Sequence, residues 1–363
     1  MFTGKNPASR TSGWPPVPRV LQAIIFITLL CSVAAAQTYN ATFLVSDIPA
    51  AATHTDKKLV NPWGLVSTPA SPWWVSDNGS GFSTLYDGAG NPQSLIVKIP
   101  SANGMGTGTP TGVVFNGTPD FELSKNNPAI FIFATEDGTI SGWNPNVQAT
   151  RAEIKVNNSS EKAVYKGLAL ATHNGKNFLY AANFGLGTVD VFDFHFAPHS
   201  FGSDAFVDPS IPSGYAPFNI QSVGDVLVVT YAKQDAAHHD DVAGAGHGFV
   251  RIFDTHGVLQ ATFQHVAALN SPWGVAWAPS HFGKFSGDLL IGQFGSGAIA
   301  AFGLDGTFKG LVRDSSGLAL RINGLWALRF GNDAAAGPST TLFFTAGVFD
   351  ESHGLFGTIT PQP

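Results

Sequence analysis

The stretch that decides the fold is SPWGVAW at residues 271–277, the opening of the clearest copy of a repeated pattern. Three further short apolar runs follow it, at 288–297, 298–302 and 306–312, and each is bounded by Gly, Pro, Asp or Ser. Apolar runs of this length between turn residues are typical of β-strands. The four runs together predict one small antiparallel sheet.

Related openings occur five more times along the chain. They read NPWG at 61–64, PTG at 110–112, YKG at 165–167, APFN at 216–219 and ING at 322–324. The openings recur at intervals of about 48 to 55 residues, at the long end of the periods of propeller blades. The sequence therefore predicts an all-β protein, a six-bladed β-propeller.

The N-terminal strand predicted at 39–46 lies outside any complete repeat. The last repeat, in contrast, holds only three strands, at 324–330, 341–346 and 355–360. A ring of blades avoids an unpaired edge at its seam when the first strand completes the last blade. We therefore expect the strand at 39–46 to become the outer strand of blade six.

The composition fits one β-rich domain. Hydrophobic residues make up 44% of the 363 residues, which is enough for a large core in a single domain spanning 37–363. Charged residues are only 12%, whereas 41 glycines and 23 prolines suit many tight turns. The formal net charge of −6 disfavours nucleic acid and anionic membranes as partners.

Residues 1–36 have the features of a signal peptide. Arg10 and Arg19 precede an apolar segment at 20–33, and three alanines at 34–36 provide a cleavage site. The apolar segment is short for a membrane span, and an uncleaved anchor is the alternative. We therefore expect a secreted or periplasmic protein. Cys31, the only cysteine, lies in the leader, so the mature chain has neither a disulfide nor a thiol nucleophile.

The ends of the second strands form a column of polar residues on one rim. In a four-stranded antiparallel blade, the turn into the innermost strand and the turn between strands two and three lie on the same face. The column consists of Asp77, Glu136, Asn183, Tyr231, Gln293 and Gly347. Asp77, Glu136, Asn183 and Gln293 are candidate ligands for Ca²⁺ or Mg²⁺, which prefer oxygen donors. The alternative is that these side chains cap their own turns.

Aromatic residues of the openings lie near the same rim. Trp63, Phe218, Trp273 and Trp326, together with Tyr231, are candidate ligand-binding residues, because aromatic faces stack on sugars and on aromatic ligands. The alternative is that the large flat side chains fill the gaps between neighbouring blades.

Two polar loops carry further candidate chemistry. Glu351 and His353 lie in the turn between strands two and three of blade six, where they could serve as acid and base beside a bound cation. A hydrogen-bonded turn is the alternative. The run HHDD at 238–241, in an insertion of blade four, has donor atoms for a metal. Adjacent residues do not easily converge on one ion, so we expect a solvated loop there.

Several longer motifs resemble a known family. They are NPWGL at 61–65, FIFATEDGTISGWNP at 131–145, YKGLA at 165–169, GFV at 248–250, SPWG at 271–274, GLWAL at 324–328 and ESHGLFG at 351–357. This series resembles a family of exported, mostly bacterial proteins of unassigned function. The resemblance covers nearly the whole mature chain. It implies a propeller fold and export, and it transfers no catalytic residue.

A more distant similarity concerns the repeat itself. A Pro-x-Gly opening followed by a strand that ends in Asp or Asn is similar to NHL-type repeats. Those six-bladed propellers include interaction modules, and related folds include calcium-dependent lactonases and a metal-dependent lyase. Acids and amides around the axis are shared with the metal-binding members, whereas Tyr231 and Gly347 depart from their pattern.

Three functional hypotheses follow. The first is a binding module whose rim holds a small polar molecule, a glycan or an extracellular protein partner. The second is a divalent-metal-dependent hydrolase, lactonase or lyase, with Asp77, Glu136 and Asn183 holding the ion and Glu351 or His353 moving protons. The third is a structural role at the cell surface.

Overall fold

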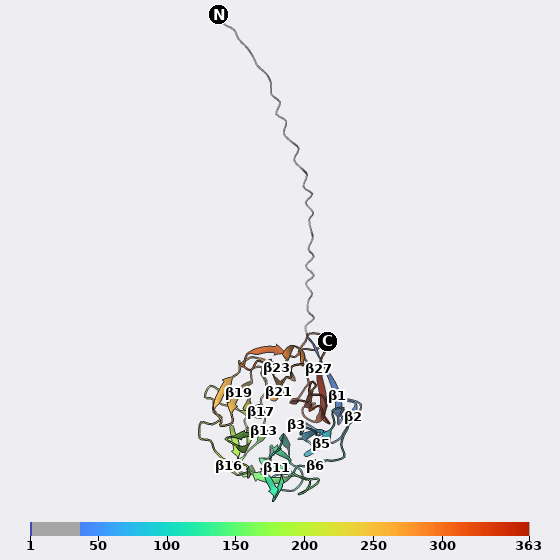
Figure 1. Cartoon of the computed structure of the whole chain (residues 1–363), viewed down its shortest axis with the longest axis vertical. Helices are drawn as coiled ribbons and strands as arrows, with labels where there is room; N and C mark the ends of the chain where they lie inside the picture. The colour runs from blue at the N-terminus through green and yellow to red at the C-terminus, as the bar shows by residue number, and fades with distance from the viewer. Residues whose placement is uncertain (2–36, 363) are drawn as a thin grey trace. The chain divides into compact units, whose positions relative to one another are not determined.

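Six small antiparallel sheets surround a central axis in the computed structural model, which describes Met1 and residues 37–362 (Figure 1). The prediction of a six-bladed β-propeller is confirmed. The predicted signal peptide lies outside the described residues. In the described part of the chain, no helix has the length and apolar character needed to span a bilayer.

The first three blades run outwards from the axis in sequence order. Blade one contains β3 (Pro62–Val66), β4 (Trp73–Asp77), β5 (Phe82–Tyr86) and β6 (Val97–Lys98). Blade two contains β7 (Pro110–Phe115), β10 (Phe131–Thr135), β11 (Thr139–Trp143) and β12 (Glu153–Asn157), with a hairpin of β8 (Glu122–Ser124) and β9 (Asn127–Pro128) inserted. Blade three contains β13 (Tyr165–His173), β14 (Lys176–Asn183), β15 (Thr188–Phe192) and β16 (Pro198–His199).

The next two blades repeat this order, and the last departs from it. Blade four contains β17 (Tyr215–Val223), β18 (Val226–Lys233), β19 (Gly248–Asp254) and β20 (Leu259–Thr262). Blade five contains β21 (Pro272–Trp277), β22 (Leu289–Gln293), β23 (Ile299–Phe302) and β24 (Phe308–Leu311). Blade six contains β25 (Leu325–Phe330), β26 (Leu342–Val348), β27 (His353–Pro361) and β1 (Tyr39–Ser46), with the short β2 (His54–Thr55) beside β1.

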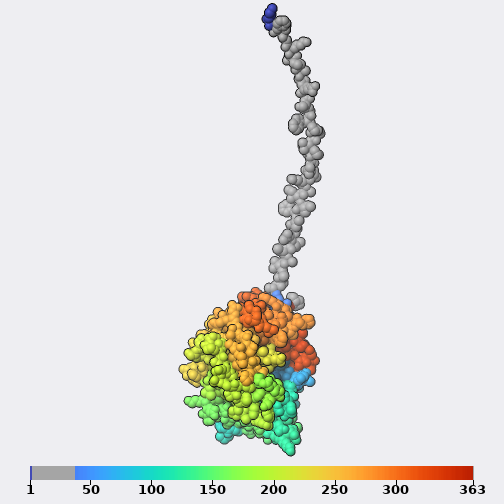
Figure 2. All heavy atoms as spheres, turned by 60° about the vertical axis from the view of Figure 1, so that its left-hand side comes forward, coloured from blue at the N-terminus to red at the C-terminus, as the bar shows by residue number. Residues whose placement is uncertain are grey.

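The first strand closes the ring as the sequence predicts. β1 pairs antiparallel with β27, from Tyr39 opposite Pro361 to Ser46 opposite Leu355. In Figure 2 the blue atoms of the segment that begins at residue 37 lie beside the orange-red atoms of the last blade. The Tyr39 hydroxyl donates to the Phe282 carbonyl oxygen at 2.9 Å, which ties the strand to blade five as well.

The close approach of neighbouring blades near the axis explains why the openings contain glycine. A Cβ on Gly64 would lie 2.4 Å from the Thr111 carbonyl oxygen of blade two, and one on Gly274 would lie 2.5 Å from the Trp326 carbonyl oxygen of blade six. Only glycine permits such an approach of two backbones near the axis. In blade four Asn219 takes this place, and its side-chain amide donates to the Trp273 carbonyl oxygen at 2.7 Å.

Gly64→Ala is therefore expected to destabilise the propeller by about 3 kcal/mol or more, because the added methyl meets fixed backbone rather than a movable side chain. Denaturant unfolding of the purified protein measures this change. Gly117→Ala is the matched control, since its Cβ would meet only the ring edge of Phe115, at 3.1 Å. Equal stabilities for the two variants would contradict this account of the repeat.

Apolar side chains fill the spaces between neighbouring blades. Trp74 of blade one stacks on Phe131 of blade two with ring centroids 4.0 Å apart, and Trp143 lies 4.7 Å from Trp74. Exposure of the three side chains is 5% or less. Each blade thus buries its faces against its neighbours and turns the ends of its strands toward two opposite faces of the disc.

Candidate functional site

The strand register fixes which polar residues share the rim. Pro62 pairs with Asp77, Tyr165 pairs with Asn183, and Pro272 pairs with Gln293. The openings and the second-strand ends therefore lie together, as the sequence argument requires.

Glu136 occupies a different position from Asp77, Asn183, Tyr231 and Gln293 of the predicted column, and Gly347 is displaced in the same way, because Leu325 pairs with Ala346. Pro110 pairs with Thr135, so Thr135 is the counterpart of Asp77 and Glu136 follows it by one residue. Successive side chains of an extended chain point to opposite sides, so this single step changes the direction of the side chain. The counterparts of Glu136 are Asn78 in blade one, Phe184 in blade three and Phe294 in blade five.

Three members of the column bind the backbone of their own blades. Asp77 Oδ2 accepts from the Thr84 amide at 3.0 Å, Asn183 Oδ1 from the Leu186 amide at 3.2 Å, and Gln293 Oε1 from the Asn270 amide at 2.8 Å. All three side chains are completely buried. Of the three bonds, the one at Asn183 caps the turn that follows its own strand, whereas Asp77 binds strand β5 and Gln293 binds the segment that precedes β21.

Asp77, Tyr231 and Gly347 of the column have further features that differ from one another. Burial raises the pKa of Asp77 well above its usual range, and its Oδ1 is buried without a partner among the described residues. The Tyr231 hydroxyl is likewise buried and unpartnered in that part of the chain, and burial raises its pKa. At Gly347 a Cβ would lie 2.1 Å from the Asn61 side-chain oxygen, so no larger residue fits.

The aromatic residues of the openings meet one another over the axis. Trp63 stacks on Trp326 with centroids 3.4 Å apart and lies edge-on to Trp273 at 5.9 Å and to Phe218 at 6.3 Å. None of the four is more than 4% exposed. They come from blades one, four, five and six, so they pack across the centre of the ring.

Lys166 takes the aromatic position in blade three. It is the second residue of the YKG opening, where blade one has Trp63, and its Nζ lies 5.0 Å from the Trp63 ring centroid. The ammonium forms an ion pair with Glu136 and lies 3.5 Å from Asp240 Oδ1. Its side chain is only 1% exposed, so this charge is almost fully desolvated and needs its carboxylate partners.

Two asparagines extend the cluster toward blade six. Asn78 Nδ2 donates to Glu136 Oε2 at 2.7 Å, and Asn61 Nδ2 donates to Asn78 Oδ1 at 3.3 Å and to Glu351 Oε2 at 2.7 Å. We call the connected set of residues the axial network: Asn61, Asn78, Glu136, Lys166, Asp240 and Glu351.

The insertion of blade four supplies the other end of this network. His239 Nδ1 lies 2.9 Å from Asp240 Oδ1, and donor atoms of Glu136, His239 and Asp240 all lie within 4.8 Å of one another. The sequence argument predicts a solvated loop, and His239 and Asp240 are indeed exposed. The sequence argument does not predict that Glu136 of blade two approaches His239 and Asp240. Asp241 is partly buried, and burial raises its pKa.

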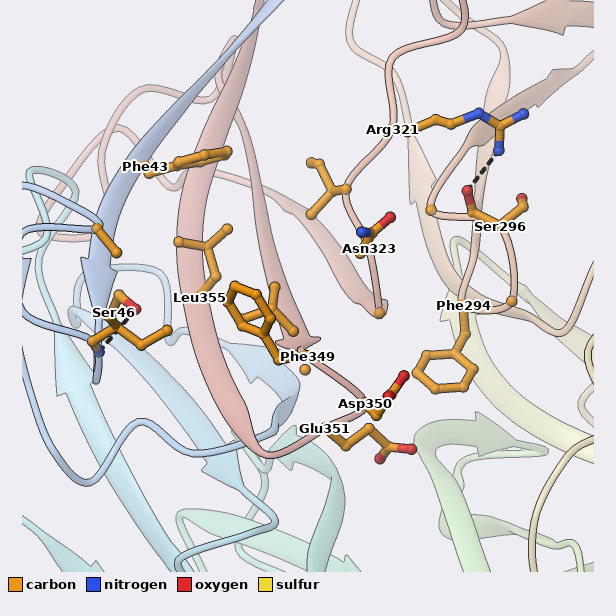
Figure 3. A pocket seen from close by; sticks show the side chains of 18 of the residues that line it. Phe43, Ser46, Phe294, Ser296, Arg321, Asn323, Phe349, Asp350, Glu351 and Leu355 are labelled. Atoms are coloured by element: carbon orange, nitrogen blue, oxygen red, sulfur yellow. Dashed lines mark hydrogen bonds between the residues drawn. The ribbon is translucent and has the colours of Figure 1, made fainter.

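Two cavities open beside the network. One has a volume of about 730 Å³ and is lined by Glu136, Lys162 and His239. The other has a volume of about 690 Å³, and Figure 3 shows Asp350, Glu351 and Phe294 close together at one end of it. The axial network thus reaches one cavity through Glu136 and the other through Glu351.

Glu351 is held in an uncommon turn. Phe349, Asp350 and Glu351 have φ angles of 55°, 52° and 63°, three successive residues in the left-handed region that non-glycine residues avoid. Each such residue costs on the order of 1 kcal/mol, and strain of this kind clusters at functional sites. Burial raises the pKa of Glu351, although the hydrogen bond from Asn61 opposes the shift.

His353 and Glu351 have different hydrogen-bond partners. Its Nδ1 is 2.7 Å from Asp47 Oδ2, just after the end of β1, so the imidazole belongs to the seam of the ring. The predicted acid and base therefore do not share a partner.

Lys166, Asn61 and Asn78 are the members of the network that the sequence argument does not identify. Lys166 had a usable signal, a charged residue where four other openings have an aromatic one.

Comparisons with solved structures place the chain among propellers of low sequence identity. A structural genomics protein of unknown function from Bacteroides thetaiotaomicron superposes with a TM-score of 0.54 at 12% identity, covering 90% of this chain and 77% of that one. A streptogramin B lyase superposes with a TM-score of 0.52 at 10% identity, covering 90% of this chain and 98% of the lyase chain. The calcium-binding protein regucalcin from Agrobacterium tumefaciens superposes with a TM-score of 0.50 at 10% identity, covering 83% of this chain and 90% of the regucalcin chain. These likenesses concern the fold.

Comparisons of sequence identify relatives at higher identity. No family model matches the chain. Uncharacterized protein R648 of Acanthamoeba polyphaga mimivirus is 32% identical over 339 residues, which cover 90% of this chain and 81% of the viral one. Uncharacterized protein L690 of the same virus is 31% identical over 340 residues, with coverages of 90% and 86%. The chain belongs to the same protein family as R648 and L690.

Proposed function

We propose that this chain is a divalent-metal-assisted hydrolase or lyase whose site is the axial network. The observation that carries the proposal is the approach of Glu136, His239 and Asp240, whose donor atoms lie within 4.8 Å of one another beside a cavity of about 730 Å³. Three protein ligands leave coordination positions open for water and substrate, which is typical of catalytic metal sites. The fold it shares with streptogramin B lyase supports the proposal by analogy.

The donor set favours a transition metal. Two carboxylates and one imidazole suit Zn²⁺, Mn²⁺ or Co²⁺ better than Ca²⁺, which prefers a complete oxygen shell. The sequence argument proposed Ca²⁺ or Mg²⁺ because its column contained oxygen donors alone. Asp77, Asn183 and Gln293 instead bind backbone amides, so His239 and Asp240 take the place of these three in the proposal.

A metal bound here would polarise a carbonyl oxygen or lower the pKa of a bound water. Lys166 fixes Glu136 through their ion pair, and Asn78 orients the other carboxylate oxygen at 2.7 Å. Glu351 keeps its proton to higher pH than a free glutamate, because burial raises its pKa. A carboxylic acid in that state suits proton donation to a leaving group in the adjoining cavity.

Metal removal tests this proposal. The purified protein is expected to carry about one equivalent of metal, and a chelator is expected to lower the melting temperature by about 5 °C, reversibly on adding Zn²⁺ or Mn²⁺. Glu136→Gln, His239→Ala and Asp240→Asn are each expected to abolish the metal-dependent shift and the hydrolysis of a panel of esters and lactones. His238→Asn, at a neighbouring histidine outside the triad, is the control. If neither the chelator nor added Zn²⁺ or Mn²⁺ changes the melting temperature of the wild-type protein, the metal site is excluded.

A ligand-binding propeller without catalysis is the second candidate. The observation that favours it is Lys166, which already neutralises Glu136 and lies 3.5 Å from Asp240. In this case the two cavities of about 690 and 730 Å³ would hold a small polar molecule, a glycan or a segment of an extracellular partner. A ligand that raises the melting temperature equally in chelator-treated and metal-loaded protein supports binding alone. Export, inferred from residues 1–36, is part of both proposals.

A further inference from the structure

The cavity of about 690 Å³ carries opposite charges at its two ends. Figure 3 shows Arg321 at one end, and Asp350 and Glu351 at the other. The volume lies within the range of sites that enclose small organic ligands. Because the two ends lie well apart in this view, a ligand that meets both must hold its own opposite charges at a distance from each other.

Arg321 provides the positive end. Its side chain is exposed, and Nη1 donates to the Ser296 carbonyl oxygen at 2.6 Å. This bond uses one of the five N–H donors of a guanidinium. Among the described residues, no carboxylate forms an ion pair with Arg321. The guanidinium is therefore held at the cavity and keeps donors for a carboxylate, which guanidinium groups bind through two parallel hydrogen bonds.

Asp350 and Glu351 provide the negative end. Asp350 is exposed, and its carboxylate forms no ion pair within the described part of the chain. Glu351 Oε2 accepts from Asn61 Nδ2 at 2.7 Å, which holds this side chain in place. Phe294 lines the same end and stacks on Trp326 with ring centroids 3.9 Å apart. Two acidic side chains and an aromatic ring suit an ammonium group, which has three N–H donors and is attracted to aromatic faces.

The wall between the two ends is apolar. Phe43, Leu355 and Phe349 lie along one side of the cavity in Figure 3. Phe349 is 70% exposed and Phe43 is 44% exposed, although both are large apolar side chains. Apolar groups that a fold leaves exposed beside a cavity are typical of ligand-binding sites. The body of the ligand is therefore expected to be apolar.

We propose that this cavity binds a short linear peptide with apolar side chains and free termini. Its ammonium meets Asp350 and Glu351, and its carboxylate meets Arg321. A single amino acid carries both charges on one carbon atom and does not reach both ends, whereas a neutral glycan would leave Arg321 and Asp350 without partners. Glu351 serves this cavity in the proposed function, so the inference rests on that function and adds the class of ligand. Binding itself does not require the metal triad.

Peptide binding to the chelator-treated full chain tests the proposal. The probes are linear peptides of alanine and phenylalanine of increasing length, and isothermal titration calorimetry measures their affinity. One saturable site is expected. N-terminal acetylation or C-terminal amidation of the best-binding peptide is expected to weaken affinity about tenfold, because each removes one charge of the ligand. If no peptide binds, or if the free and blocked peptides bind equally well, the proposal is overturned.

Four variants assign the two ends of the cavity. Asp350→Asn is expected to weaken binding of the free peptide about fivefold and to leave the acetylated peptide unaffected. Arg321→Met is expected to weaken the free peptide by a similar factor and to leave the amidated peptide unaffected. Asp225→Asn and Arg313→Met are the controls, because both residues are exposed and lie outside the cavity, and Arg313 also donates to a backbone carbonyl oxygen at 2.6 Å. If the controls weaken binding as much as the two cavity variants, the peptide binds elsewhere and the proposal is overturned.

The titrations contain no metal, so the two proposals can fail separately. Peptide binding by a protein that shows no metal-dependent shift supports the peptide site alone. A metal-dependent shift without peptide binding supports the enzyme proposal and overturns the peptide site.

Discussion

A chain that begins at residue 49 is expected to lose its cooperative thermal transition, whereas a chain that begins at Gln37 keeps it. The deletion removes β1, the outer strand of blade six, and leaves β27 as an unpaired edge. It also removes Tyr39 and Val45, which are almost completely buried. Each of these two side chains contributes about 1.5–3 kcal/mol by burial alone. Together with the lost ladder of hydrogen bonds, the deficit approaches the whole stability of a typical domain.

Thermal unfolding followed by circular dichroism measures this difference between the two chains. Thr42→Ala in the longer chain is the control, since Thr42 lies in the same strand but is exposed, and it should change the melting temperature by no more than a few degrees. If the shorter chain melts cooperatively at the same temperature as the longer one, pairing of β1 with β27 is not what holds the ring closed.

Lys166→Met is expected to destabilise the protein by about 3–5 kcal/mol, because it leaves Glu136 charged, poorly solvated and without its cation. Glu136→Gln should cost a similar amount for the opposite reason. The double variant should lie within about 2 kcal/mol of the wild type, since neither unpaired charge is left behind. Denaturant unfolding of the four proteins at neutral pH gives the coupling energy between the two side chains.

The chain offers a matched exposed pair for this cycle. Lys155 and Glu153 lie 3.5 Å apart, but their side chains are 23% and 42% exposed. Removing either partner should change stability by less than about 1 kcal/mol, because water already screens the pair. A coupling energy between Lys166 and Glu136 as small as that of the exposed pair would mean that the ammonium is not held in the axial network in solution.

Most of the fold could be predicted because each repeat contains both the residues that form its own strands and the residues that pack against neighbouring blades. The opening SPWG combines the start of a strand, an aromatic residue for the axis and a glycine for close approach to the next blade. The missing strand of blade six follows from counting, and β1 spans Tyr39–Ser46 as predicted. These features depend on spacing along the chain, which a sequence shows directly.

The site was less predictable because it depends on single-residue register and on distant contacts. An alignment of strand ends assigns Glu136 to the column of Asp77, whereas the pairing of Pro110 with Thr135 moves it by one residue and points it elsewhere. The blade-four insertion has no periodic pattern that would indicate its course. Nothing in the sequence therefore shows that Asp240 reaches Lys166, 3.5 Å away and from another blade.

The seam between the first and last strands also determines the order in which the molecule can fold. Gln37 hydrogen-bonds to the Gln362 carbonyl oxygen, a contact between residues 325 positions apart in the sequence. Bringing such distant segments together costs about 5 kcal/mol of chain entropy unless intervening structure has already formed. Blades one to five can assemble from neighbouring segments, while the sixth has to wait until both ends of the chain are present. A ribosome that stalls before the last strand would therefore release an open arc of blades rather than a smaller ring.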